Sequence, residues 1–283
     1  MRVIAHGGAG GAPDEPEPRQ AVLDGAVADG AAAATPVEAV LETVRALESS
    51  PRFNAGVGGS IQADGVVRTD AGLMTEDRSV GAACSMPGVE HAADVARVVM
   101  EETPHVMIAG VHAVDLADAY GVDVEANLVS DRTRERWGEM DPPDATEVRE
   151  QAAWVRERFG GSDTVGAVAS DGNRLAACTS TGGRWAAMAG RVGDVPQVGS
   201  GFFCTEAGGA SATGAGEDIT RVTLARRGVE LLEEHEPETA AATAIEELES
   251  VTGSTAGLIL ADGEGRTGSA ANAETMQVAV AGD

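Results

Sequence analysis

The sequence predicts an α+β fold in which antiparallel sheets are covered by helices. Two observations favour this class: the expected strands come in hairpins, and the expected helices come in pairs. The amino-acid composition adds an expectation about the hydrophobic core. Of the 283 residues, 43% are hydrophobic, but only 3% are aromatic and 37 are glycine. We therefore expect a core of small and β-branched side chains, with tight turns and close backbone approaches.

The first expected elements are a strand and a well-punctuated helix. Residues 2–5 read as a strand that ends in a glycine-rich turn, HGGAGG at 6–11. Thr35 is a natural N-cap, Pro36 takes the first helical position and Glu38 completes a capping box. The buried face of this helix is marked by apolar residues at helical spacing: Val37, Val40, Leu41, Val44 and Leu47.

The middle of the chain changes character. A hairpin turn is expected at 63–65, and helices over 92–101 and about 106–119. From about 122 to 163 the sequence is rich in Arg, Glu and Asp, with a proline break at 141–144. This composition predicts an exposed connector with at most one helix, and a plain surface insertion explains it equally well.

Regular structure is expected to resume abruptly at Thr164. Residues 164–169 and 175–181 form a predicted hairpin around a turn at 171–173. The remaining expected elements are helices at about 218–234 and 238–249, a strand at 257–261, a turn at 262–265 and a last strand through 276–280.

The charge balance is extreme. The chain carries 46 acidic and 20 basic residues, a formal net charge of −26, and every basic residue is arginine. This charge disfavours phosphate backbones and anionic membranes, so nucleic acid and membrane partners are not expected. Because the acids are spread along the chain, the pattern is typical of a surface adapted to high salt, and we expect a haloarchaeal host. An ordinary acidic protein is the alternative.

Cysteine usage and the N-terminus predict a cytoplasmic protein. Cys84, Cys178 and Cys204 are sparse and widely spaced, which indicates reduced, buried thiols rather than a disulfide framework. No Cys/His cluster indicates zinc, and no organic cofactor is expected. The start, MRVIAHGG, is not typical of a signal peptide, and no apolar stretch approaches the roughly 18 residues of a membrane helix.

The candidate nucleophile is a threonine. None of the five histidines lies beside a nucleophile signature, so a Ser-His-Asp arrangement is hard to assemble. A threonine can use its own α-amine as the base when it begins a chain, since that amine has a pKa of about 7.7–8.0. The Asp163–Thr164 junction, where the charged connector meets a strand, suits the required cut. Most threonines that open strands are structural, so the junction alone does not decide.

Motifs that follow one another in a fixed order support the Asp163–Thr164 junction as a cleavage site. They are DTVGAV at 163–168, TSTGG at 179–183, GRVGD at 190–194 and TGAGE at 213–217, preceded by HGGAG at 6–10, FNAG at 53–56 and TPHVM at 103–107. With these motifs nearly the whole chain resembles the plant-type L-asparaginase/isoaspartyl peptidase family of N-terminal-nucleophile (Ntn) hydrolases.

The resemblance implies an αββα sandwich, two antiparallel sheets between helical layers, formed by residues 1–283 as a single domain. It also implies self-cleavage into an α chain 1–163, whose exposed linker is about 122–163, and a β chain 164–283. Thr164 would attack the carbonyl of Asp163 by an N-to-O acyl shift, and hydrolysis would free its amine. The assembled protein would be a dimer of αβ heterodimers.

The family's reaction is hydrolysis of the side-chain amide of L-asparagine, or of β-aspartyl dipeptides, through an acyl-enzyme on Thr164. The resemblance places Thr181 and Asn54 beside the nucleophile. It assigns Arg191 and Asp194 to a clamp for the substrate's α-carboxylate and α-ammonium. Thr213 and Gly214 would form the oxyanion hole, and Gly216 would allow close approach of the substrate. Simpler alternatives are an exposed strand threonine for Thr181 and a surface ion pair for Arg191 and Asp194.

The resemblance further implies a sodium-binding loop whose ligands are backbone carbonyls, at Leu47, Glu48, Ser49, Ser50 and Phe53. Rival enzymes are a glycosylasparaginase, which shares the fold and nucleophile, and a threonine-dependent protease. From other classes, the turn at 6–11 could cradle a phosphate, although it lacks the P-loop spacing. An uncleaved, inactive homologue acting as a binding protein is the last alternative.

Overall fold

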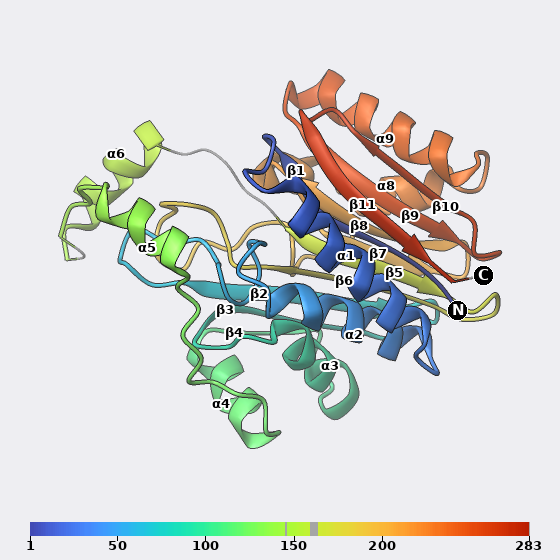
Figure 1. Cartoon of the computed structure of the whole chain (residues 1–283), viewed down its shortest axis with the longest axis horizontal. Coiled ribbons are helices and arrows are strands. Elements are labelled where there is room, and N and C mark those ends of the chain that lie inside the picture. The colour runs from blue at the N-terminus through green and yellow to red at the C-terminus, as the bar shows by residue number, and fades with distance from the viewer. Residues whose placement is uncertain (145, 159–163, 283) are drawn as a thin grey trace.

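Two sheets lie face to face between layers of helices (Figure 1). The computed structural model describes residues 1–144, 146–158 and 164–282. The large sheet has the order β11-β1-β5-β6-β2-β3-β4 and the small sheet the order β10-β9-β8-β7. Strands of the large sheet are β1 (Arg2–Gly10), β2 (Arg68–Thr75), β3 (Val80–Pro87), β4 (Met107–Ala109), β5 (Val165–Ser170), β6 (Leu175–Thr181) and β11 (Thr275–Ala281). Those of the small sheet are β7 (Phe202–Thr205), β8 (Gly208–Gly214), β9 (Ala256–Asp262) and β10 (Thr267–Ala271).

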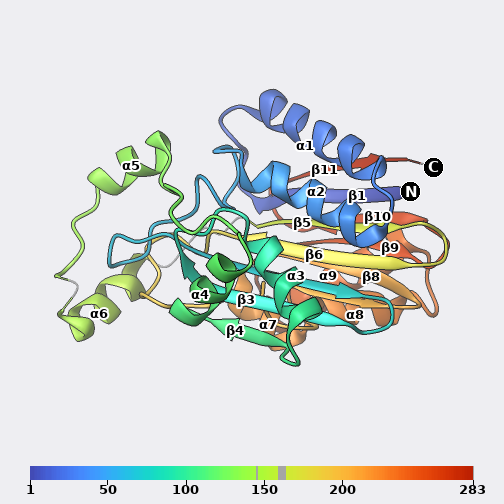
Figure 2. The same ribbon diagram turned by 90° about the horizontal axis from the view of Figure 1, so that it is seen from below.

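Helices cover the outer face of each sheet, as Figures 1 and 2 show. The large sheet is covered by α1 (Pro16–Ala31), α2 (Pro36–Glu48) and α3 (Ala92–Glu102), and α4 (Val111–Ala119) follows at its edge. The small sheet is covered by α8 (Leu224–Leu231) and α9 (Pro237–Thr252), with the short α7 (Gly216–Val222) beside them. The αββα sandwich is therefore confirmed.

Three apolar layers hold the sandwich together. One lies between α1–α3 and the large sheet, one between α8 and α9 and the small sheet, and one between the two sheets. Strand β1 shows how a single strand serves two layers: Ile4 packs between the sheets, whereas Val3 and Ala5 pack under the helices. Alanine and valine dominate these layers, as the composition predicted.

Helix α2 forms where its caps and apolar stripe predicted. The Thr35 hydroxyl accepts a hydrogen bond from the Glu38 backbone N–H at 3.2 Å, and Val40, Val44 and Leu47 are fully buried. The predicted hairpin of β5 and β6 is also confirmed, with Val165 opposite Ser180. All three cysteines are buried and unbridged, as expected.

Several element predictions were wrong. The predicted helix at 106–119 is a strand and a helix, β4 and α4, separated at Gly110 with a φ of 63°. The sheet is not wholly antiparallel, since β3 and β4 run parallel. The predicted helix at 218–234 breaks at Thr223, which adopts a left-handed conformation with a φ of 50°. Helix α1 was missed because its alanines and glycines give little apolar contrast.

The connector holds two helices rather than at most one. They are α5 (Asp131–Gly138) and α6 (Val148–Arg158), which lie to one side of the sandwich in Figures 1 and 2. The three tryptophans anchor them: the Trp137 ring lies 6.5 Å from that of Trp154 and 6.1 Å from that of Trp185, edge to face in both cases. The connector is therefore packed against the loop that follows β6.

Segments on either side of the predicted cut form one sheet. Strand β5 pairs with β1 on one side, Ala5 opposite Ala167, and with β6 on the other. Strand β6 in turn pairs with β2. Thr164 thus lies at the start of a central strand. Among the described residues, no helix is both long enough and apolar enough to span a bilayer.

Candidate active site

Thr164 and Thr181 lie at the same end of two neighbouring strands. The register that places Val165 opposite Ser180 brings Thr164 opposite Thr181 one step further. Each of these threonines is only 3% exposed. Thr181 is therefore not the exposed strand threonine of the simpler alternative. Asp163, the other half of the predicted cleavage site, lies outside the described residues.

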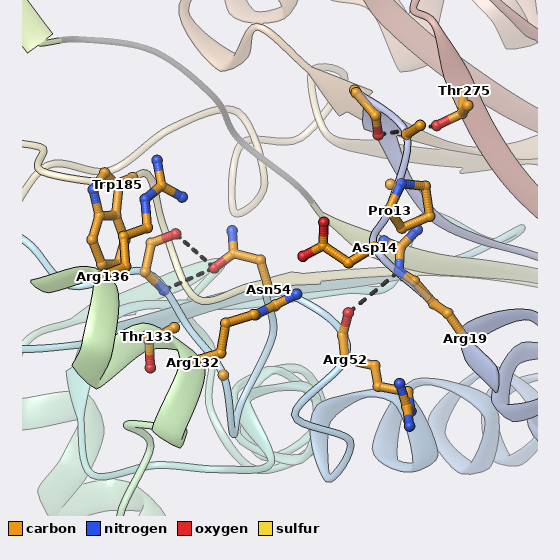
Figure 3. Close-up of a pocket in the computed structure, with 16 residues that line it drawn as sticks. Pro13, Asp14, Arg19, Arg52, Asn54, Arg132, Thr133, Arg136, Trp185 and Thr275 are labelled. Atoms are coloured by element: carbon orange, nitrogen blue, oxygen red, sulfur yellow. Dashed lines mark hydrogen bonds between the residues drawn. The ribbon is translucent and has the colours of Figure 1, made fainter. Parts of the chain in front are cut away.

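Asn54 is held rigidly beside Thr181. Its side-chain amide donates to the Gly183 carbonyl at 2.7 Å and to the Thr181 hydroxyl at 3.5 Å. Its Oδ1 accepts from the backbone and hydroxyl of Ser60 at 2.8 and 2.9 Å, as Figure 3 shows. Asn54 thereby joins the loop after α2 to the loop after β6, and keeps an amide next to the two threonines.

Thr213 and Gly214 end β8 beside the glycine-rich end of β1. The Thr213 hydroxyl accepts from the Ala9 backbone N–H at 3.2 Å and is fully buried. Gly214 has a φ of 128°, and a Cβ there would lie 2.6 Å from the Thr255 carbonyl oxygen, so the position requires glycine. These residues carry the donors predicted for an oxyanion hole, one hydroxyl and one backbone N–H.

Arg191 and Asp194 lie together without pairing as a surface bridge. The Arg191 Nε donates to Glu217 at 2.9 Å, and Glu217 also binds Arg184 at 2.8 Å. Asp194 is buried, and its Oδ2 has no hydrogen-bond partner among the described residues. Burial is the main reason why the pKa of Asp194 is raised to about 6, although Arg191 and the backbone oppose the shift.

Gly216 leaves space beside Arg191 and Asp194. A Cβ on Gly216 would lie 2.5 Å from Asp194 Oδ1 and 2.9 Å from Arg191 Nη2. Any larger residue would therefore press on both predicted clamp groups. A buried carboxylate with an unused oxygen, beside a guanidinium and a glycine gap, is suited to a small zwitterion.

Two acidic residues of the site were missed by sequence reasoning. Glu217 fixes the Arg191 guanidinium, and Asp70 lies opposite Thr181 on β2. Asp70 accepts from the Ser85 backbone N–H at 2.6 Å, and burial raises its pKa to about 7, with Arg191 lowering it and Asp194 raising it further. Asp70 differs from most other acidic residues of the chain in its burial, which cannot be read from the sequence.

His6 belongs to a buried polar chain between the sheets. Its Nε2 lies 2.7 Å from the Ser211 hydroxyl, which lies 2.7 Å from that of Thr179. Because Thr179 donates to the Gly201 carbonyl, Ser211 donates to Thr179 and accepts from a neutral His6. Burial lowers the pKa of His6 to about 3, despite an opposing backbone interaction with Thr164 and with a further lowering by Arg19.

This burial predicts acid sensitivity. The folded pKa of His6 lies below its ordinary value of 6.5, so the unfolded chain binds the extra proton and stability falls as the pH drops from about 6.5 toward 3. We expect the free energy of unfolding to fall by up to about 1.4 kcal/mol more per pH unit in the parent than in His6→Gln. Denaturant unfolding at several pH values measures this. The exposed His112→Gln is the control, and equal slopes in all three proteins contradict the prediction.

The predicted sodium loop follows α2. A Cβ on Gly56, whose φ is 50°, would lie 2.3 Å from the Glu48 carbonyl oxygen, and one on Gly58 would lie 2.9 Å from that of Phe53. The chain therefore passes close to the Glu48 and Phe53 carbonyls at these two glycines, and the Glu48 carbonyl accepts from the Val57 backbone N–H at 2.8 Å. The Glu48 carboxylate points elsewhere, to the Ser180 hydroxyl at 2.6 Å, and burial raises its pKa to about 8. In the described part of the chain no group of three His, Cys, Asp or Glu side chains could hold a metal.

Comparison with known proteins agrees with this geometry. A family model described as asparaginase matches residues 1–283. The chain belongs to this asparaginase family. It is 40% identical to the plant-type L-asparaginase of Pyrobaculum calidifontis, over 97% of this chain and 94% of the relative. It is 36% identical to the plant-type L-asparaginase of Thermococcus kodakarensis, over 98% of this chain and 95% of the relative.

A second kind of relative carries both activities in its name. The isoaspartyl peptidase/L-asparaginase of Danio rerio is 38% identical, over 79% of this chain and 73% of the relative. Asparaginase family membership accounts for the ordered motifs, because the structure brings most of them to one end of the sandwich. Thr164 and Thr181 lie at the ends of β5 and β6, Thr213 lies at the end of β8, and Arg191 is bound to Glu217 just after β8. The motif at 103–107 is the exception, since it leads into β4 at the other end of the large sheet.

Proposed function

We propose that the chain is an amidohydrolase that hydrolyses the side-chain amide of L-asparagine and β-aspartyl dipeptides, with Thr164 as its nucleophile. The observation that carries this proposal is the pair of buried threonines, Thr164 and Thr181, at the ends of paired strands and next to Asn54. Arg191 and Asp194 lie in the loop that follows β6. The names of the relatives support both substrates.

In the proposed reaction, the α-amine of Thr164 takes the proton of its own hydroxyl as Oγ attacks the amide carbon. Thr213 and Gly214 stabilise the oxyanion through a hydroxyl and a backbone N–H. The protonated amine then passes its proton to the leaving nitrogen, and ammonia or an amino acid departs. Water attacks the resulting ester, which releases aspartate and restores Thr164. Thr181 and Asn54 position the nucleophile.

We propose that maturation cuts the bond before Thr164 and gives an α chain 1–163 and a β chain 164–283 within a single domain. The support is that β5 and β6 pair with β1 and β2, so both pieces share one sheet and stay together after the cut. By family resemblance, two such αβ units form a dimer. A cytoplasmic location fits three buried free thiols, which are typical of a reducing compartment.

We also propose sodium in the loop of Leu47, Glu48, Ser49, Ser50 and Phe53. The proposal rests on the family resemblance, and the backbone carbonyl oxygens of such a loop are ligands that a hard cation takes. Bound there, the ion would neutralise the carbonyl dipoles and stiffen the loop that carries Asn54. Arginine-only basic residues and the net charge of −26 support a high-salt host.

Turnover assays test the proposal directly. Purified, matured protein is expected to release ammonia from L-asparagine, and aspartate together with the second amino acid from a β-aspartyl dipeptide. The assay needs high salt, and D-asparagine serves as a control because its α-groups cannot meet Arg191 and Asp194 together with the nucleophile. Absence of both activities in a fully cleaved preparation contradicts the proposal.

A further inference from the structure

A hollow rich in arginine lies beside Asn54. It has a volume of about 410 Å³. One wall is formed by Asn54, Ser60 and the glycine-rich end of β1, and another by helix α5 of the connector, as Figure 3 shows. Helix α5 contributes Arg132, Thr133 and Arg136 to this wall. The hollow therefore adjoins the predicted nucleophile site, because Asn54 is itself hydrogen-bonded to Thr181.

Two of the three arginines of α5, Arg132 and Arg136, stand apart from most others in the chain. In a protein with a net charge of −26, most arginines form ion pairs with carboxylates, for example Arg191 with Glu217 and Arg227 with Glu247. Arg132 and Arg136 have no such pair within the described ranges, although Asp14 lines the same hollow. Arg132 and Arg136 thus place two positive charges in the hollow beside Asn54, where they can bind an anion.

Arg136 is also held in place. Its guanidinium lies 4.3 Å from the centre of the Trp185 ring, and Trp185 is packed edge to face against Trp137 of α5. Partial burial and the charge of Arg132 lower the pKa of Arg136, which indicates that the two cations are close enough to repel one another. An anion between them would relieve that repulsion, and guanidinium groups bind carboxylates with two parallel hydrogen bonds.

We propose that Arg132 and Arg136 bind the free carboxylate of the amino acid that leaves when a β-aspartyl dipeptide is cleaved. This inference rests on the proposed function and deepens it. With the aspartyl part of the substrate in the Arg191 and Asp194 clamp, L-asparagine ends at an amide nitrogen and reaches no further. A dipeptide extends beyond the scissile bond and carries one more carboxylate. The arginines therefore select the peptide substrate over the simple amide.

The test compares both substrates in matched variants. In matured Arg132→Gln/Arg136→Gln, we expect kcat/KM for a β-aspartyl dipeptide to fall about 10- to 100-fold, mainly through KM, while that for L-asparagine stays within about 2-fold. The control is Arg149→Gln/Arg156→Gln, which removes the same charge from two exposed positions of α6. Mass spectrometry first establishes equal cleavage, so that only matured enzyme is compared.

A dipeptide amide completes the design. Replacing the terminal carboxylate of the substrate by a carboxamide should cost the parent enzyme about as much as the double substitution, and should cost the substituted enzyme almost nothing. Equal losses for asparagine and dipeptide, or an amide hydrolysed as well as the acid by the parent, overturn the inference while leaving the proposed function standing. A parent that hydrolyses neither substrate overturns the proposed function and this inference together.

Discussion

Thr164→Ala is expected to remain a single uncut chain with no measurable turnover. The substitution removes the only hydroxyl proposed to attack both the preceding peptide bond and the substrate. Loss of a nucleophile typically lowers the rate by at least about 10³-fold. Thr164→Ser keeps a hydroxyl and, after any cut, an α-amine, so it should be cleaved and should turn over substrate more slowly than the parent. Gel analysis and ammonia release measure both effects.

Stability must be separated from chemistry in this comparison. Thr164 is buried, so the variant's thermal unfolding should be recorded beside its activity. Thr146→Ala, at an exposed position of the connector, controls for the loss of a threonine near the cut. A folded Thr164→Ala protein that is still processed at this junction, or still hydrolyses asparagine, contradicts the assignment of the nucleophile.

The second large effect is expected at the clamp. Arg191→Gln should raise KM for L-asparagine about 10²- to 10⁴-fold, because two charge-assisted hydrogen bonds to the substrate's α-carboxylate are lost, each of about 1.5–3 kcal/mol. The fold should tolerate the change, since Glu217 keeps its bond to Arg184. Steady-state kinetics on fully cleaved enzyme measure the change.

The matched control is Arg174→Gln. Arg174 forms an exposed ion pair with Asp171 in the turn between β5 and β6, at the opposite end of those strands from Thr164. Its loss should leave KM unchanged within error, because such exposed pairs contribute little. A KM in Arg191→Gln that equals that of the control contradicts the clamp.

Local signals in the sequence explain which elements could be predicted. Helix α2 has a capping threonine, a proline at its first position and a clear apolar stripe, and it forms there. Helix α1 is rich in alanine and glycine, so its buried and exposed faces differ little in hydrophobicity, and it was missed. The break at Thr223 requires a left-handed threonine, which only tertiary packing imposes, so two helices were predicted as one.

The site divides in the same way. The sequence motifs predicted four residues of the site: Thr164, Thr181, Arg191 and Thr213. The antiparallel register of β5 and β6 explains why Thr164 and Thr181 lie close together. Asp70 and His6 could not be predicted, since their roles depend on burial between elements distant in sequence. The charged composition of the connector concealed the tryptophan packing that directs Arg136 to the hollow.

The central claim is that the chain activates itself by cutting before Thr164, and intact mass spectrometry of the parent protein tests it most directly. After purification and incubation in high salt, the spectrum should show two fragments whose masses meet at the Asp163–Thr164 bond, with threonine at the new N-terminus. A parent that stays at its full 28.6 kDa at every salt concentration contradicts the account.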